Sequence, residues 1–237
     1  MIELKIIIAP SKTMKYKDYD FDISQPIFQK ETDYIYSLLK QYNDEQLCEL
    51  MKISYKQATK VYDYYHQRQE LYPALSLYQG TVFKQLEIEK YNAHHDYLHR
   101  HLCIMSAYYG VLKYNTAISP YRLDMSMKLN HVNLYEYWYT PIYQYFENED
   151  FIISLASKEF TDMLHHPYLY FIDFIEIKDN KIKRNAMVIK KARGQMLNQM
   201  ILSEIKTLND LKKLNIDGFI YDEYLSKDKI VVFTRKI

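Results

Sequence analysis

The pattern of hydrophobic and polar positions predicts one strand followed by several helices in the first half of the chain. Residues 3–8 form an apolar run that ends before Pro10, which is typical of a buried strand. Asn43 is placed to cap one of the following helices, and Ser54 with Gln57 forms a capping box for the next. Helices are expected at residues 27–41, 44–51, 55–70, 81–86 and 91–105, and a short strand is expected at residues 75–80.

The second half of the chain mixes strands and helices. Residues 133–139 and 140–146 predict two helices, because Thr140 can cap the second one and Pro141 occupies its first position. The pair Asp179-Asn180 tolerates a left-handed backbone and predicts a hairpin turn. Strands are expected at residues 151–157, 167–177, 181–189, 217–222 and 229–235, with helices at 190–206 and from Thr207 onwards.

No repeat, low-complexity tract or clear linker interrupts this pattern. We therefore expect one domain, residues 1–237, of the α+β class (mixed α/β), with a mixed sheet and surrounding helices. Residues 91–105 and the hydrophobic segment around Gly110 also suggest a helix-hairpin-helix-like subregion, whose hairpin amides would grip DNA phosphates. The alternatives for this segment are the wall of an active site or a turn between core elements.

Composition narrows the class of protein. Hydrophobic residues make up 48% of the chain and charged residues 26%, which indicates a globular protein rather than a disordered one. The net charge of +1 means that any phosphate or nucleic-acid site must be a local basic patch. Cys48 and Cys103 lie among apolar neighbours and are expected to be free buried thiols. No apolar run is long enough for a membrane span or a signal peptide, so we expect a cytoplasmic protein.

Glycine is scarce in this chain, with only four in 237 residues. Each glycine is therefore expected to mark a positive φ or a close approach of backbone. Four isolated glycines cannot form a dinucleotide-binding fingerprint or a Walker loop.

Basic residues cluster in the segment KKARGQM, residues 190–196. If a helix begins here, Lys190, Lys191 and Arg193 oppose its dipole unless an anion lies among them. These side chains and the amides of the first turn would then form a phosphate cradle. The alternative is a solvated basic face.

Three other short segments carry candidate chemistry. Arg122 in SPYRLDM is expected to be paired or to bind a ligand, with Asp124 two residues later as its partner. Lys12 follows the first strand, where ligand contacts are common in α/β sheets. Ser157 and Glu159 begin a helix and more often act as capping residues than as acid–base groups.

Histidines are frequent between residues 94 and 101, but no carboxylate or thiolate spacing completes a metal site. We expect neither a metal nor a cofactor. No G-x-S-x-G motif is present either, so a hydrolase triad is not indicated.

The motifs occur together and in the same order in a known family. The chain resembles the YaaA peroxide-stress resistance family of bacterial cytoplasmic proteins nearly from end to end. The segments that carry this resemblance are APSKT at 9–13, YQGTVF at 78–83, MSAYYGVL at 105–112, PYRLDMS at 120–126, SLASKEF at 154–160 and KKARGQM at 190–196.

The resemblance implies a helix-hairpin-helix DNA binder with a basic cleft in an unusual α/β fold. It also implies a role in survival under hydrogen peroxide and in limiting free intracellular iron. Three positions depart from the family pattern: Ala107 and Ser126 replace glycines, and Asn198 replaces an arginine, which removes one charge from the expected cleft.

Two functions follow as hypotheses. In the first, the protein binds DNA backbone with weak sequence preference through a basic cleft, using the residues Lys12, Gly110, Arg122, Lys190, Lys191 and Arg193. In the second, the same cations with Asp124, Ser157 and Glu159 form the site of an enzyme for a phosphorylated or carboxylated small molecule. Direct iron binding by histidine and carboxylate clusters, with the His-rich segment 94–101 that contains His95 and His99, is a third and less favoured hypothesis. A deep closed cavity would favour the enzyme, and a long open groove would favour DNA.

Overall fold

The computed structural model describes residues 4–19 and 21–237. Its main sheet has eight strands in the order β11-β12-β9-β8-β1-β3-β4, with β10 paired to β9. The strands of this sheet are β1 (Leu4–Ile8), β3 (Leu102–Ser106), β4 (Gly110–Leu112), β8 (Phe151–Ser154), β9 (Leu169–Lys178), β10 (Lys181–Lys183), β11 (Ile220–Tyr221) and β12 (Ile230–Lys236). Two further small sheets pair β2 (Tyr72–Pro73) with β5 (Ala117–Ile118) and β6 (Lys128–Leu129) with β7 (Val132–Asn133).

The main sheet is mixed, as the sequence predicts. Strand β1 runs parallel to both of its neighbours, with Ile6 opposite Leu102 of β3 and Ile153 of β8. All five residues of β1 are buried, because a parallel strand in the middle of a sheet is covered on both faces. The pairs β3–β4, β9–β10 and β11–β12 are antiparallel. The expected α+β class with a mixed sheet is confirmed, whereas the single domain stays a prediction.

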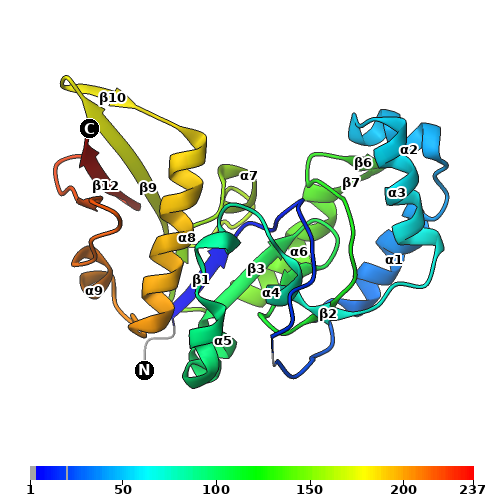
Figure 1. The fold of residues 1–237 in the computed structure, drawn as a ribbon, viewed down its shortest axis with the longest axis horizontal. Helices are drawn as coiled ribbons and strands as arrows, with labels where there is room; N and C mark the ends of the chain where they lie inside the picture. The colour runs from blue at the N-terminus through cyan, green and yellow to red at the C-terminus, as the bar shows by residue number, and fades with distance from the viewer. Residues whose placement is uncertain (1–3, 20) are drawn as a thin grey trace.

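Helices surround this sheet and also gather beyond one end of it. Figure 1 shows α1, α2 and α3 together at one end of the molecule, away from β9, β10 and β12 at the other end. The α-helices are α1 (Gln29–Leu39), α2 (Asp44–Met51), α3 (Tyr55–His66), α4 (Ala74–Leu77), α5 (His95–His101), α6 (Leu134–Phe146), α7 (Lys158–Thr161), α8 (Ala186–Leu202) and α9 (Leu208–Lys212). Two 3₁₀-helices, η1 (Phe83–Gln85) and η2 (Ile88–Ala93), precede α5 and contact α8.

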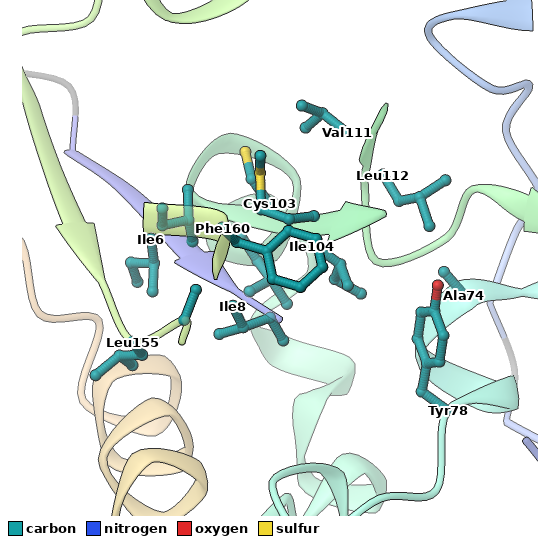
Figure 2. Close-up of a cluster of buried hydrophobic side chains, with 14 of the residues drawn as sticks. Ile6, Ile8, Ala74, Tyr78, Cys103, Ile104, Val111, Leu112, Leu155 and Phe160 are labelled. Atoms are coloured by element: carbon teal, nitrogen blue, oxygen red, sulfur yellow. The ribbon is translucent and has the colours of Figure 1, made fainter. Parts of the chain in front are cut away.

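The core lies around the central parallel strands. Figure 2 shows Ile6 and Ile8 of β1 beside Cys103 and Ile104 of β3, with Phe160 of α7 against them. All five side chains are at least 95% buried. Burying an aliphatic or aromatic side chain of this size contributes about 1.5–3 kcal/mol to stability. The cluster therefore holds the carboxyl ends of the parallel strands β1 and β8 in place.

The helix around Pro141 differs from the expectation of two helices. A single helix, α6, continues through Pro141 and begins where Asn133 accepts a hydrogen bond from the amide of Tyr135. Its buried side chains recur every four residues: Leu134, Trp138, Ile142 and Phe146. Packing of this continuous stripe outweighs the cost of an interior proline, which is about 3 kcal/mol.

Residues 74–77 form helix α4 rather than the strand expected at residues 75–80. Every residue of α4 is buried. A short run that is buried on all sides carries no periodicity, so its sequence cannot distinguish helix from strand.

The hairpin at Asp179 and Asn180 is confirmed, since both residues have a positive φ between β9 and β10. The second strand is shorter than expected and ends at Lys183. Asn185 then caps α8 by accepting hydrogen bonds from the amides of Met187 and Val188. Helix α8 therefore begins four residues before the position that the sequence suggested.

The structure differs from a helix-hairpin-helix at Gly110. Helix α5 leads into β3, and a tight turn returns the chain as the antiparallel strand β4, so a buried β-hairpin replaces the expected motif. The amides of Tyr108 and Tyr109 donate to Ser106 Oγ at 3.2 and 3.0 Å, so the hairpin interior uses the donors that a phosphate would need.

Gly110 has a φ of +74°, and a Cβ there would lie 2.6 Å from the Trp138 ring and 2.7 Å from Phe28. It is a packing position rather than an anion contact. Of the two alternatives to a DNA-binding hairpin, the structure supports a turn between core elements.

Candidate functional site

A pocket of about 580 Å³ lies at the carboxyl ends of the parallel neighbours β1 and β8. Ligands commonly bind at such an edge in α/β sheets. Five separate segments line it, with residues 9–14, 79–84, 121–124 and 155–160 joined by Lys190 and Arg193 of α8. The buried side chains of Leu155, Phe160 and Tyr121 also line it.

Most of the candidate residues meet in this pocket. Those that line it are Lys12, Arg122, Asp124, Ser157, Glu159, Lys190 and Arg193. Gly110 and Lys191 do not line it. Lys84 also lines the pocket, and the sequence analysis missed it. It directly follows the YQGTVF motif at 78–83, which could have drawn attention to it.

The loop that carries Lys12 is held against residues 79 and 80. The amide of Gln79 donates to the carbonyl of Thr13 at 2.9 Å. Gly80 lies so close that a Cβ there would be 2.4 Å from Ser11 Oγ. This contact fixes the loop after β1 and places Lys12 at the pocket.

Helix α8 approaches the pocket through Gly194. A Cβ at this position would lie 2.3 Å from the carbonyl oxygen of Val82, so only glycine allows the helix to lie this close. Lys190, one turn earlier, and Arg193, the residue before Gly194, are thereby brought to the pocket. The expectation that each scarce glycine marks a positive φ or a close approach is confirmed at all four positions.

The phosphate cradle of first-turn amides at residues 190–193 is wrong. Because α8 begins at Ala186, these residues lie within the helix, where amides donate to carbonyls four residues earlier. Only the side chains of Lys190 and Arg193 remain as candidates for contact with an anion.

Within the described residues, the guanidinium group of neither pocket arginine has a hydrogen-bond or ion-pair partner, and Nε of Arg122 and of Arg193 is buried. Nε of Arg235 is also buried and unbonded, but its terminal nitrogens reach Glu176 at 2.7 Å and Asp217 at 3.1 Å. Arg184 makes two hydrogen bonds to Asp173, at 3.0 and 2.7 Å. The terminal nitrogens of Arg122 and Arg193 are therefore the ones that could bind a ligand.

Each pocket arginine is held by its surroundings. The hydroxyl of Tyr65 donates to the carbonyl of Arg122 at 2.8 Å and accepts from its amide at 3.1 Å. The guanidinium of Arg193 lies over the Phe171 ring, 5.5 Å from its centroid. Burial lowers the pKa of Arg193 from its ordinary value, which is the expected effect of removing a cation from water.

The carboxylates of the pocket are arranged differently from the expectation. Asp124 pairs with Lys12, with Nζ and Oδ2 2.6 Å apart, rather than with Arg122. Burial raises the pKa of Glu159 and the charge of Asp124 raises it further, while the amide of Met125 and Lys12 partly offset these effects. Glu159 therefore takes up a proton at a higher pH than an ordinary glutamate does.

Ser157 is the N-cap residue of α7, as expected, but its side chain makes no capping hydrogen bond. Its carbonyl accepts the amides of Phe160 and Thr161 instead. The hydroxyl therefore remains a polar group of the pocket wall.

Lys191 lies outside the pocket because it occupies a different face of α8 from Lys190 and Arg193. Its Nζ is 3.2 Å from Oδ2 of Asp217, which Arg235 also contacts at 3.1 Å. Lys191 thus forms an ion-pair cluster with Asp217 and Arg235 of strand β12.

Asn198 does not reach the pocket either. Its side chain accepts hydrogen bonds from the amide of Glu87 at 2.9 Å and the hydroxyl of Tyr91 at 2.6 Å, and donates to the Glu87 carboxylate at 2.8 Å. The residue joins α8 to η2, so its departure from the family pattern takes no charge from the pocket.

The histidines make separate contacts. Nδ1 of His94 lies 3.1 Å from Glu204, and His95 packs on Phe21 and Tyr114. Within residues 4–19 and 21–237, no three His, Cys, Asp or Glu side chains form a group that could hold a metal ion. In the same part of the chain, no helix is both long and apolar enough to cross a membrane.

Comparison with known proteins reveals similarity along almost the whole chain. The model of a family described as peroxide stress protein YaaA matches residues 4–225. A UPF0246 protein of Pediococcus pentosaceus is 34% identical over 250 positions, which cover 98% of this chain and 98% of the relative. UPF0246 proteins of Crocosphaera subtropica and Fusobacterium nucleatum are 32% and 29% identical, each with 99% of its own length covered.

Proposed function

The chain belongs to the peroxide stress protein YaaA family, and from this premise we propose that it binds DNA through phosphate contacts in the basic pocket. Such binding would support a role in limiting oxidative, iron-dependent damage to DNA. The observation that carries the proposal is the convergence of five cations on one pocket: Lys12, Lys84, Arg122, Lys190 and Arg193.

This local charge matters because the whole molecule has a net charge of only +1. The charge of Asp124 is compensated by Lys12, and burial raises the pKa of Glu159 above its usual value. The remaining cations give the pocket a positive field that attracts phosphates. Nothing in this field reads a base, so the sequence preference of binding should be weak.

The size of the pocket limits how DNA can enter. A volume of about 580 Å³ is in the range of small-molecule sites and suits one nucleotide rather than a duplex. The DNA is therefore expected to present an end, a gap or a nucleotide that has left the stack.

A second candidate function is an enzyme for a small phosphorylated or carboxylated molecule. The arrangement that favours it is the proximity of Glu159, whose pKa is raised, to the Lys12–Asp124 pair. A carboxyl group with a raised pKa beside cations suits acid–base chemistry.

The test is fluorescence anisotropy of labelled duplex, gapped and single-stranded DNA with three proteins: the parent, Arg122→Gln/Arg193→Gln and Lys191→Gln. The parent should lose affinity steeply between about 50 and 200 mM salt. Loss of two charged contacts should weaken binding by at least about tenfold. Lys191→Gln is the matched control on the same helix and should bind like the parent.

A flat salt dependence, or equal losses in Lys191→Gln and the double variant, would contradict phosphate binding in the pocket. If the folded parent binds none of the three DNAs, the enzyme becomes the preferred function.

A further inference from the structure

We infer that the pocket recognises a phosphate monoester, the dianionic group found at the end of a broken DNA strand, in preference to the internal diesters of an intact strand. This inference rests on the proposed function and specifies which phosphate the pocket takes. The same chemical group occurs on free mononucleotides, and the experiment below separates the two sources.

The shape of the pocket is the first argument. Its cations come from four segments that surround one volume: the loop after β1, the 79–84 segment, the loop after β5 and α8. The side chains of Leu155, Phe160 and Tyr121, which are buried in the protein, line the same volume. An internal phosphate carries a sugar on both sides and needs a channel with two exits. A terminal phosphate has one ester bond and fits a site that is closed on one side.

The supply of hydrogen-bond donors is the second argument. Arg122 and Arg193 each offer a planar fork of N–H groups, and the buried Nε of each has no partner among the described residues. An internal diester has one negative charge and two free oxygens. A monoester has close to two charges near neutral pH and three free oxygens. Two unpaired guanidinium groups with Lys190 therefore match the monoester better.

The acidic residues are the third argument. Asp124 lies 2.6 Å from Lys12, so its charge is already compensated. When Glu159 is protonated, its carboxyl group donates a hydrogen bond, and the hydroxyl of Ser157 supplies another donor in the same wall. These donors can form hydrogen bonds only with a ligand oxygen that does not already accept from Arg122 or Arg193. The third oxygen of a monoester provides the acceptor.

The experiment compares one gapped duplex in three versions that differ only at the gap: a 5′-phosphate, a 3′-phosphate, or hydroxyls at both ends. Binding to the parent protein is measured by anisotropy at constant salt. Adenosine monophosphate and inorganic phosphate are added as competitors. The version with hydroxyls only should bind at least about tenfold more weakly than the better of the two phosphorylated versions, since one dianion–arginine contact is lost.

The variants locate the effect. In Arg193→Gln and in Arg122→Gln, the difference between phosphorylated and hydroxyl DNA should shrink, whereas Lys191→Gln should keep it in full. The comparison is a double-mutant cycle in which one change is made in the protein and the other at the DNA end. A variant that only weakens DNA binding in general lowers the affinity for all three duplexes equally and leaves their difference unchanged. Thermal unfolding of each variant verifies that it is folded.

The outcomes separate the two claims. Equal binding of all three gapped duplexes overturns the inference and leaves DNA binding standing. If the protein binds none of the duplexes but calorimetry detects adenosine monophosphate, the monoester site stands and its source is a small molecule. If neither DNA nor monophosphate binds, the inference and the proposed function both fall.

Discussion

Lys12 and Asp124 lie 112 positions apart in the sequence, and their side chains meet at 2.6 Å at the edge of the pocket. The Lys12 side chain is 58% exposed, and exposed pairs of this kind add only about 0–1 kcal/mol to stability. The pair therefore contributes little to folding. Its larger effect is to compensate a carboxylate that would otherwise repel an anion.

The first prediction concerns Asp124→Asn. The free energy of unfolding should change by less than about 1 kcal/mol, because a solvent-screened pair is lost. Affinity for phosphate-bearing DNA should rise, because Lys12 becomes free to contact the ligand. Chemical denaturation and anisotropy measure the two effects. A marked loss of DNA affinity in a stable variant would show that Asp124 contacts the ligand itself.

The second prediction concerns the pH dependence of Glu159. Its pKa is raised above the usual 4.5, chiefly by burial, so protonation favours the folded state. The stability that Glu159 contributes is present below pH 4.5 and is lost as the pH rises through its higher folded value. Glu159→Gln, which imitates the protonated form, should therefore unfold at a higher temperature than the parent at neutral pH. The gain should disappear in acid.

The same variant should also bind phosphate-bearing DNA more tightly at neutral pH, by about fivefold for the removal of one nearby negative charge. Its binding should depend less on pH than that of the parent. Glu147→Gln changes an exposed glutamate outside the pocket and serves as the control. If Glu159→Gln weakens binding while the control does not, the carboxylate form is the one that the ligand requires.

The third prediction concerns Gly194→Ala. In an unobstructed helix this change would stabilise the protein by up to about 1 kcal/mol. Here the new Cβ would lie 2.3 Å from the carbonyl oxygen of Val82, which is backbone and cannot rotate away. We therefore expect destabilisation by about 1–3 kcal/mol and weaker DNA binding, because α8 must move away from the pocket. A more stable variant in urea denaturation would disprove the close approach.

The fourth prediction concerns Gly110→Ala. The positive φ and the proximity of Trp138 and Phe28 should reduce stability by about 2 kcal/mol or more. Unfolding can be followed by fluorescence, since Trp138 is the single tryptophan of the chain. A variant of unchanged stability that no longer binds DNA would restore the β3–β4 turn as a phosphate contact.

The sequence predicts which residues line the pocket better than it predicts how their side chains pair. Short motifs identified Lys12, Arg122, Asp124, Ser157, Glu159, Lys190 and Arg193, and all of them line one pocket. The partner of Asp124 could not be predicted, because Lys12 and Arg122 are both basic and only the three-dimensional path of the loop after β1 decides between them.

The error at Lys191 has a clear physical origin. Residues advance by about 100° along a helix, so Lys190 and Arg193 share a face and Lys191 does not. This reasoning requires the right helix start. The segment around Asn185 contains residues that also suit a strand, and the β-like pattern concealed the cap that begins α8.

Gly110 shows a different limit. A hydrophobic-Gly-hydrophobic segment after a helix suits either a phosphate-gripping hairpin or a buried β-turn. The choice depends on Trp138, which is fully buried and donates from Nε1 to the carbonyl of Ala107 at 2.8 Å. That contact comes from a helix 31 positions away and has no trace in the local pattern.

The central claim is that a phosphate-binding site lies between Arg122 and Arg193, and one salt titration tests it most directly. Binding of gapped, 5′-phosphorylated DNA is measured for the parent, Arg122→Gln/Arg193→Gln and Lys191→Gln. We expect a steep salt dependence for the parent and Lys191→Gln, with weak and flatter binding for the double variant. Parent-like binding by a folded double variant would contradict it.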